Sequence, residues 1–107
     1  MLEKYQKLTD ETAIYPDAGT GSTAEYLYLS TSLGGEVGEV LNVMKKCYRD
    51  GELNTIALWA ELGDVMWYIL RICHVLNWNL ENVIIDNHQK LTDRKLRGKL
   101  GGGGDKR

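Results

Sequence analysis

The chain has 107 residues, of which 43% are hydrophobic and 26% are charged. That length is typical of one domain, and that composition excludes collagen-like and disordered chains. The 13 Lys and Arg residues against 15 Asp and Glu residues give a formal charge of −2, so we expect no general basic surface for duplex nucleic acid. One proline, no phenylalanine and few β-branched runs favour helices.

The first residues and the cysteines indicate a compartment. No apolar run follows Met1, so we expect no secretory signal. The two cysteines, Cys47 and Cys73, do not make a disulfide framework. We therefore expect a cytoplasmic protein with reduced thiols.

Helical periodicity and loop signals divide the first half of the chain. Residues 2–13 have mixed helical periodicity, and a Pro- and Gly-rich loop covers residues 15–22. A long apolar-periodic helix is predicted over residues 24–48. It ends before Gly51, because a glycine after basic residues is a good helix stop.

The second half contains two further helices and a tail. One helix is predicted over residues 52–76, and Asn79 is positioned to cap a last helix over residues 80–95. Five glycines in residues 98–107 indicate a tail without regular structure. The sequence thus predicts one all-α, four-helix-bundle-like domain over residues 1–97, followed by the Gly-rich tail over residues 98–107.

The third predicted helix is apolar nearly all round. It is not a membrane span, because Glu61, Asp64, Arg71 and His74 fall within it and charges are costly in a bilayer. A helix of this kind is buried on several sides. In so small a chain we expect partner subunits to cover it, which predicts an obligate homo-oligomer.

Two pairs of acidic residues stand on the second and third predicted helices. Glu36 falls inside the apolar stripe of the second helix, and Glu39 lies at its edge. Glu61 and Asp64 form the other pair, and the members of each pair are neighbours because they are spaced i, i+3. A short connection makes the two helices antiparallel neighbours, so the four carboxylates are predicted to converge.

Four converging carboxylates repel one another unless a cation lies between them. Oxygen ligands without paired His or Cys favour Mg²⁺, with Mn²⁺ as an alternative, and magnesium usually completes its shell with water and substrate phosphate. A di-iron bundle is disfavoured because neither His74 nor His88 stands three residues after a Glu. The acids therefore predict a metal site for a phosphorylated ligand.

Basic residues supply candidate phosphate contacts. Asn87, Lys90 and Arg94 flank the predicted buried face of the last helix, where Lys and Arg could neutralise phosphate or pair with neighbouring acids. Lys46 and Arg49 close the second helix and are weaker candidates, because cations there also suit the helix dipole.

Aromatic residues on the third helix, Trp59, Trp67 and Tyr68, could stack on a base. Aromatics at helical spacing are more often part of a core, so base binding by Trp67 and Tyr68 is the weaker part of this prediction.

Several motifs together resemble the MazG-like all-α nucleoside triphosphate pyrophosphohydrolases. The resemblance covers nearly the whole chain and is specific as a set, although each fragment alone is weak. Its fragments are Thr12-Ala13-Ile14-Tyr15-Pro16, Gly35-Glu36-Val37-Gly38-Glu39-Val40, Lys45-Lys46 with Arg49-Asp50, Glu61-Leu62-Gly63-Asp64-Val65-Met66-Trp67-Tyr68, Asn87-x-x-Lys90-Leu91-x-x-Arg94, Arg97-Gly98 and Gly104-Asp105-x-Arg107.

This resemblance implies hydrolysis of a nucleoside triphosphate between its α and β phosphates, giving a monophosphate and pyrophosphate. It implies that Glu36, Glu39, Glu61 and Asp64 are Mg²⁺ ligands. It also implies that Lys90 and Arg94 contact phosphate, with Asn87 at a motif position beside them, and that the assembly is a homodimer or homotetramer. The tail departs from the family, because Lys106 precedes Arg107 where relatives often have Asn.

Two other classes of function stay open at this stage. One is a non-catalytic helical module that binds metal and nucleotide without turnover. The other is an interaction bundle without a ligand, against which the buried acids argue. The sequence leaves the base and sugar preference and the number of metal ions open.

Overall fold

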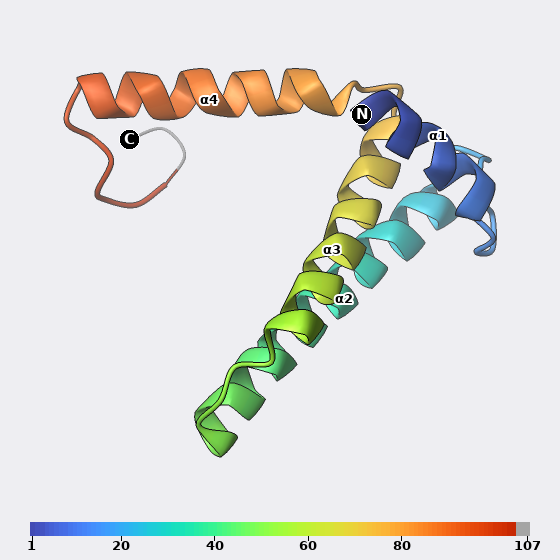
Figure 1. The fold of residues 1–107 in the computed structure, drawn as a ribbon. Coiled ribbons are helices and arrows are strands. Elements are labelled where there is room, and N and C mark those ends of the chain that lie inside the picture. Colours follow the sequence, from blue (N-terminus) through green and yellow to red (C-terminus); the bar gives the residue numbers. More distant parts are fainter. Residues whose placement is uncertain (105–107) are drawn as a thin grey trace.

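In the computed structural model, which describes residues 1–104, the chain is all helical (Figure 1). This confirms the predicted all-α class. The described residues contain no strand. The helices are α1 (Leu2–Thr12), α2 (Thr23–Asp50), α3 (Thr55–Val75) and α4 (Leu80–Leu96).

Side-chain caps set the starts of the three longer helices. Ser22 Oγ accepts a hydrogen bond from the Glu25 amide at 3.3 Å, and Asn54 Oδ1 accepts one from the Ala57 amide at 3.0 Å. Asn79 Oδ1 accepts one from the Glu81 amide at 2.9 Å, as its predicted role requires. Because Asn54 is the cap, α3 begins at Thr55 and not at residue 52 as predicted.

A left-handed glycine ends α2 and starts the short connection to α3. Gly51 has φ +78°, and its amide donates to the Cys47 carbonyl at 2.7 Å. Left-handed backbone favours glycine because that residue has no Cβ. The connection is short, so α2 and α3 form the antiparallel hairpin that carries most helix contacts (Figure 1).

Ion pairs and hydrogen bonds attach α1 to the C-terminal part of α3. The guanidinium of Arg71 pairs with the carboxylate of Asp10. His74 Nε2 lies 2.8 Å from the same carboxylate, and its Nδ1 lies 2.7 Å from the Gln6 amide nitrogen. These contacts join the His74 side chain of α3 to α1, which is a structural role.

The buried apolar core is small and lies where α3 meets α1 and the start of α4. Its cluster comprises Leu70, Cys73 and Leu80, with Tyr5 and Ile69 packed against it. Leu29 of α2 is fully buried as well. The hairpin carries large exposed apolar side chains at its other end, including Ile56 and Trp59, each 83% exposed. Within residues 1–104, no helix has the length and apolarity needed to cross a bilayer.

The last helix stands away from the hairpin. α4 begins at the C-terminal end of α3, which it contacts, and then runs outward, leaving the hairpin behind (Figure 1). Of the face predicted to be buried, Leu80 is buried, whereas Val83, Ile84 and Leu91 are exposed. This part of the prediction was wrong for a single chain, because only the start of α4 has a neighbouring helix to pack against.

Candidate functional site

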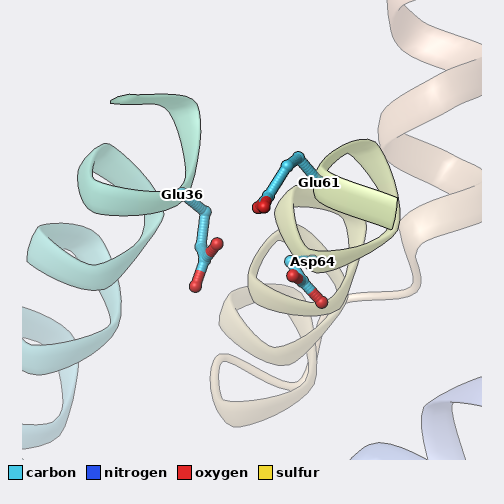
Figure 2. Close-up of side chains that lie close together, drawn as sticks. All are labelled: Glu36, Glu61 and Asp64. Atoms are coloured by element: carbon cyan, nitrogen blue, oxygen red, sulfur yellow. The ribbon is translucent and has the colours of Figure 1, made fainter. Parts of the chain in front are cut away.

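Three carboxylates meet between α2 and α3, facing one another across the hairpin. Glu36 comes from α2, and Glu61 and Asp64 come from successive turns of α3 (Figure 2). One carboxylate oxygen from each residue lies within 4.8 Å of the others. We call these three residues the carboxylate triangle. The i, i+3 spacing on α3 and the antiparallel packing of α2 against α3 produce it.

Repulsion between the like charges of these carboxylates makes it unfavourable for all of them to be ionised together. Partial burial raises the pKa of Glu36 above its ordinary value, and the negative charges of Asp64, Glu61 and Glu39 raise it further. A cation between the oxygens would reverse that effect. The donors are all carboxylate oxygens, which suit a hard divalent cation such as Mg²⁺ or Mn²⁺. The residues present therefore fit a divalent metal.

Glu39 lies outside the triangle. It is exposed on α2, one turn after Glu36, and its charge contributes to the raised pKa of Glu36. Three of the four predicted acids thus come together, and the fourth stands beside them.

A cavity of about 550 Å³ opens next to the triangle. Its wall includes two of the three carboxylates, Glu36 and Asp64, together with aromatic residues from both helices of the hairpin. We call it the aromatic cavity, and its lining residues are Thr12, Ile14, Tyr15, Pro16, Tyr28, Glu36, Asp64, Trp67 and Tyr68. Its size is in the range of ordinary ligand pockets.

Aromatic rings pack against one another along this wall. The Tyr15 ring stacks on Tyr28 with centroids 5.1 Å apart and meets Trp67 edge-on at 6.3 Å. Trp67 meets Tyr68 edge-on at 4.9 Å, and its indole N–H donates to Thr12 Oγ1 at 3.0 Å. The structure thus places the predicted base-binding pair, Trp67 and Tyr68, at the cavity. Trp59 is not among its lining residues.

Sequence reasoning missed the contribution of the segment between α1 and α2. Ile14, Tyr15 and Pro16 line the cavity, whereas the loop pattern of residues 15–22 indicated only a connection. The available signal was the Ile14-Tyr15-Pro16 run itself, which places an apolar and an aromatic residue at the start of a Gly-rich loop.

The predicted phosphate-binding residues lie on other parts of the chain. Asn87 is exposed, Lys90 is half-buried and Arg94 is buried, all on α4. Since α4 runs away from the hairpin, one chain does not bring this helix to the triangle (Figure 1). Lys46 lies ten residues after Glu36 on α2, which is roughly 15 Å along the helix axis.

The remaining basic candidate, Arg49, pairs with its neighbour. Its Nε and Nη2 donate to the two carboxylate oxygens of Asp50 at 2.7 and 2.8 Å. Both side chains are exposed, so the pair contributes little stability, and the guanidinium could exchange Asp50 for another anion at little cost.

The tail motif is described only in part. Gly98 has φ +69°, and the Lys99 amide donates to the Arg94 carbonyl at 2.7 Å, which closes the end of α4. Arg97 Nε donates to Asp93 at 2.8 Å. Asp105 and Arg107, the end of the motif in the sequence, lie outside the described residues.

Comparison with known proteins decides the family. The model of the MazG nucleotide pyrophosphohydrolase domain matches residues 25–97, which include the whole triangle. The chain belongs to this MazG family. It is also similar to the gene 37 protein of Mycobacterium phage L5. The two are 43% identical over an alignment of 112 residues, gaps included, which covers 99% of this chain and 98% of that protein. No solved structure matches.

The MazG match sorts the site residues into two groups. The triangle, Glu39, Trp67, Tyr68 and the basic residues of α4 fall within the matched part. The cavity residues Thr12, Ile14, Tyr15 and Pro16 precede it. The acid site thus belongs to the MazG domain, and one wall of the cavity lies outside the matched residues.

Proposed function

We propose that this MazG protein hydrolyses a nucleoside or deoxynucleoside triphosphate between the α and β phosphates, releasing a monophosphate and pyrophosphate. The carboxylate triangle carries the proposal, because three crowded acids beside a ligand-sized cavity have a clear use in holding a metal–polyphosphate complex. Membership of the pyrophosphohydrolase family supports the reaction type.

Glu36, Glu61 and Asp64 would hold the metal, with Glu39 as a fourth acid at the edge. We propose Mg²⁺, with Mn²⁺ as a substitute, because the donors are all oxygens. When bound, the cation neutralises phosphate charge and acidifies a water molecule.

Glu39 is the residue that we propose accepts a proton from the attacking water. It lies one turn beyond Glu36 and outside the triangle, so its carboxylate is not committed to the metal by the geometry. A general base must be within reach of the proton that it removes, and the effect of the Glu39 charge on the pKa of Glu36 supports a position near the site.

Lys90 and Arg94 would offset the charge that builds on the departing pyrophosphate, with Asn87 beside them. Because α4 projects away from its own hairpin, we propose that the half-buried Lys90 reaches the triangle of a second copy, whereas Arg94 is buried in its own copy. Lys46 and Arg49, at the far end of α2, are secondary candidates for contacts with the polyphosphate.

We propose a homodimer or homotetramer. Ile56 and Trp59 at the end of the hairpin and the exposed apolar face of α4 offer surfaces that a second copy would cover. Large exposed apolar patches mark interaction sites. We also propose a reducing cytoplasm as the location of this protein.

Trp67 and Tyr68 would contact the base in the aromatic cavity. Base–aromatic stacking tolerates different bases, since every base has a π-face. These two residues therefore support nucleotide binding without fixing which base is preferred.

Product analysis tests the proposal. Purified protein is incubated with each NTP and dNTP and Mg²⁺, and the products are resolved by ion-exchange chromatography. Monophosphate with pyrophosphate supports the proposal, whereas diphosphate with orthophosphate contradicts it. Glu61→Gln should abolish turnover while the fold is kept, and Glu52→Gln, an exposed acid of the α2–α3 connection, should not.

The second candidate is a module that binds metal and nucleotide without hydrolysis. It is favoured by the distance of α4 from the triangle in a single chain. It predicts that Mg²⁺ and nucleotide raise the melting temperature while no product forms.

A further inference from the structure

We propose that residues 13–22, the segment between α1 and α2, form the base-selective wall of the nucleoside site, and that Glu25 and Arg71 hold this wall in place. Ile14 would contact the bound base, and Glu25 and Arg71 would act as positioning residues. The inference rests on the proposed function, and it adds which residues select among nucleotides.

The wall is held first by a buried carboxylate. Glu25, in the first turn of α2, is 0% exposed. Its two oxygens accept hydrogen bonds from the Gly19 amide at 2.6 Å, the Gly21 amide at 2.8 Å and the Tyr15 hydroxyl at 2.6 Å. All three donors belong to the segment. The Glu25 side chain of α2 is thus hydrogen-bonded to residues near both ends of the segment.

Glycine is favoured at the two amide donors. Gly19 has φ +80° and Gly21 has φ +64°, a conformation that side chains with a Cβ adopt at a cost. These backbone angles belong to the turn whose two amides bond the same carboxylate. The segment is therefore folded around Glu25, and its conformation depends on that acid.

The wall is held a second time from α3. Arg71 Nε donates to the Tyr15 hydroxyl at 3.0 Å, and the same guanidinium pairs with Asp10 of α1. The Tyr15 hydroxyl therefore bonds both α2 and α3, while its ring stacks on Tyr28. An aromatic ring that is fixed in this way before a ligand arrives costs little entropy when the ligand binds.

Ile14 is the exposed part of this wall. It lines the aromatic cavity, yet 92% of its surface is exposed. When a ligand covers an apolar side chain in that position, the removal of its surface from water favours binding. Because the fold hardly buries it, a change at Ile14 should alter binding without altering stability.

The cavity joins this wall to the reacting end of the ligand. Glu36 and Asp64 line the same cavity as Ile14, Tyr15 and Pro16. A triphosphate held at the triangle therefore has its nucleoside next to the segment. Residues 13–22 also precede the part matched by the MazG model, which begins at residue 25. We infer that the matched part holds the phosphates and that the segment before it selects the base.

The test compares Ile14→Ser with the conservative Ile14→Leu and with Glu25→Gln. For each variant, kcat and KM are measured with every NTP and dNTP and Mg²⁺, and binding of the same nucleotides is measured by equilibrium dialysis with Ca²⁺. Inorganic tripolyphosphate serves as the probe without a base. Melting temperatures report the fold, and the exposed Tyr48→Leu serves as the control variant.

We expect Ile14→Ser to raise KM for the preferred nucleotide about tenfold, because a hydrophobic contact of this size discriminates by that order. The value of kcat, the affinity for tripolyphosphate and the melting temperature should change little, and Ile14→Leu should restore KM. Glu25→Gln should flatten the preference among bases. If Glu25→Gln fails to fold, the two Ile14 variants still decide.

The outcomes separate this inference from the proposed function. If wild-type protein turns over nucleotides but both Ile14→Ser and Glu25→Gln keep its KM values and base preference, the selective wall is overturned and the hydrolase stands. If wild-type protein binds nucleotides without turnover, the hydrolase fails and the dialysis data still test the wall. If it binds tripolyphosphate and no nucleotide better, the wall is overturned as well.

Discussion

The hydroxyl of Tyr15 donates a hydrogen bond of 2.6 Å to the fully buried carboxylate of Glu25. The bond joins the segment between the first two helices to the first turn of α2. It also sets the position of an aromatic ring in the cavity beside the carboxylate triangle.

Removing that hydroxyl should destabilise the protein. Tyr15→Phe keeps the ring but leaves a buried carboxylate with one donor fewer, which we expect to cost about 1.5–3 kcal/mol. Urea denaturation followed by circular dichroism measures the change. Tyr48→Phe removes a hydroxyl from an exposed tyrosine and should change the free energy of unfolding little. Equal effects of the two variants would show that the Tyr15–Glu25 bond adds no stability.

Glu25 should make the fold sensitive to acid. Burial alone would raise its pKa, but hydrogen bonds from Tyr15, Gly19 and Gly21 and the charge of Arg71 outweigh burial and lower it. Because the pKa of Glu25 is lowered in the folded state, ionised Glu25 stabilises the protein at pH values above its ordinary pKa of about 4.5. That contribution is lost as the pH falls from there through the lowered pKa of the folded state.

The measurement is the free energy of unfolding between pH 7 and pH 3. Glu25→Gln should be less stable than wild-type protein at pH 7, and the difference should shrink toward pH 3. Glu52→Gln, at an exposed position, should follow the wild-type curve. A difference for Glu25→Gln that stays constant with pH would contradict the lowered pKa.

Divalent cations should stabilise the protein through the carboxylate triangle. Mg²⁺ or Mn²⁺ should raise the melting temperature in a concentration-dependent way, and a chelator should reverse it. Asp64→Asn should lose this response and Glu52→Gln should keep it. Without metal, Asp64→Asn should be as stable as wild-type protein or more stable, because the charge of Asp64 raises the pKa of Glu36. A wild-type melting temperature that neither Mg²⁺ nor Mn²⁺ changes would contradict the proposed metal site.

The exposed end of the hairpin should hold the subunits together. Trp59→Glu places a charge on a side chain that is 83% exposed in one copy, and we expect it to shift the assembly toward monomers in sedimentation velocity. Leu8→Glu puts the same charge on α1 and should leave the assembly intact. Monomeric wild-type protein, or a Trp59→Glu assembly of unchanged size, would contradict this surface as the interface.

Much of the helix pattern could be predicted because its signals are local. Gly51 and Asn79 act through their own backbone neighbourhood, so their roles follow from residue type and position. The meeting of Glu36 with Glu61 and Asp64 needed only helical spacing and an antiparallel turn. Glu39 differs because a position at the edge of a stripe does not say toward which neighbour the side chain turns.

The rest depended on contacts between distant residues. The role of Tyr15 comes from Arg71, 56 residues later in the chain, and no periodic pattern reports such a pair. The face of α4 was read correctly as apolar, but an apolar face does not say whether the same chain or another copy covers it. That limit explains why the prediction that Val83, Ile84 and Leu91 are buried was wrong for a single chain.

The outward direction of α4 allows complementation between two variants if each active site takes its acidic residues from one polypeptide and its basic residues from another. Two inactive proteins, Glu61→Gln and Lys90→Ala, should then rescue each other when they are unfolded and refolded together. In a random mixture of dimers, half would be mixed, and each mixed dimer would regain one intact centre, so roughly a quarter of wild-type turnover should return. Neither protein alone should show that recovery.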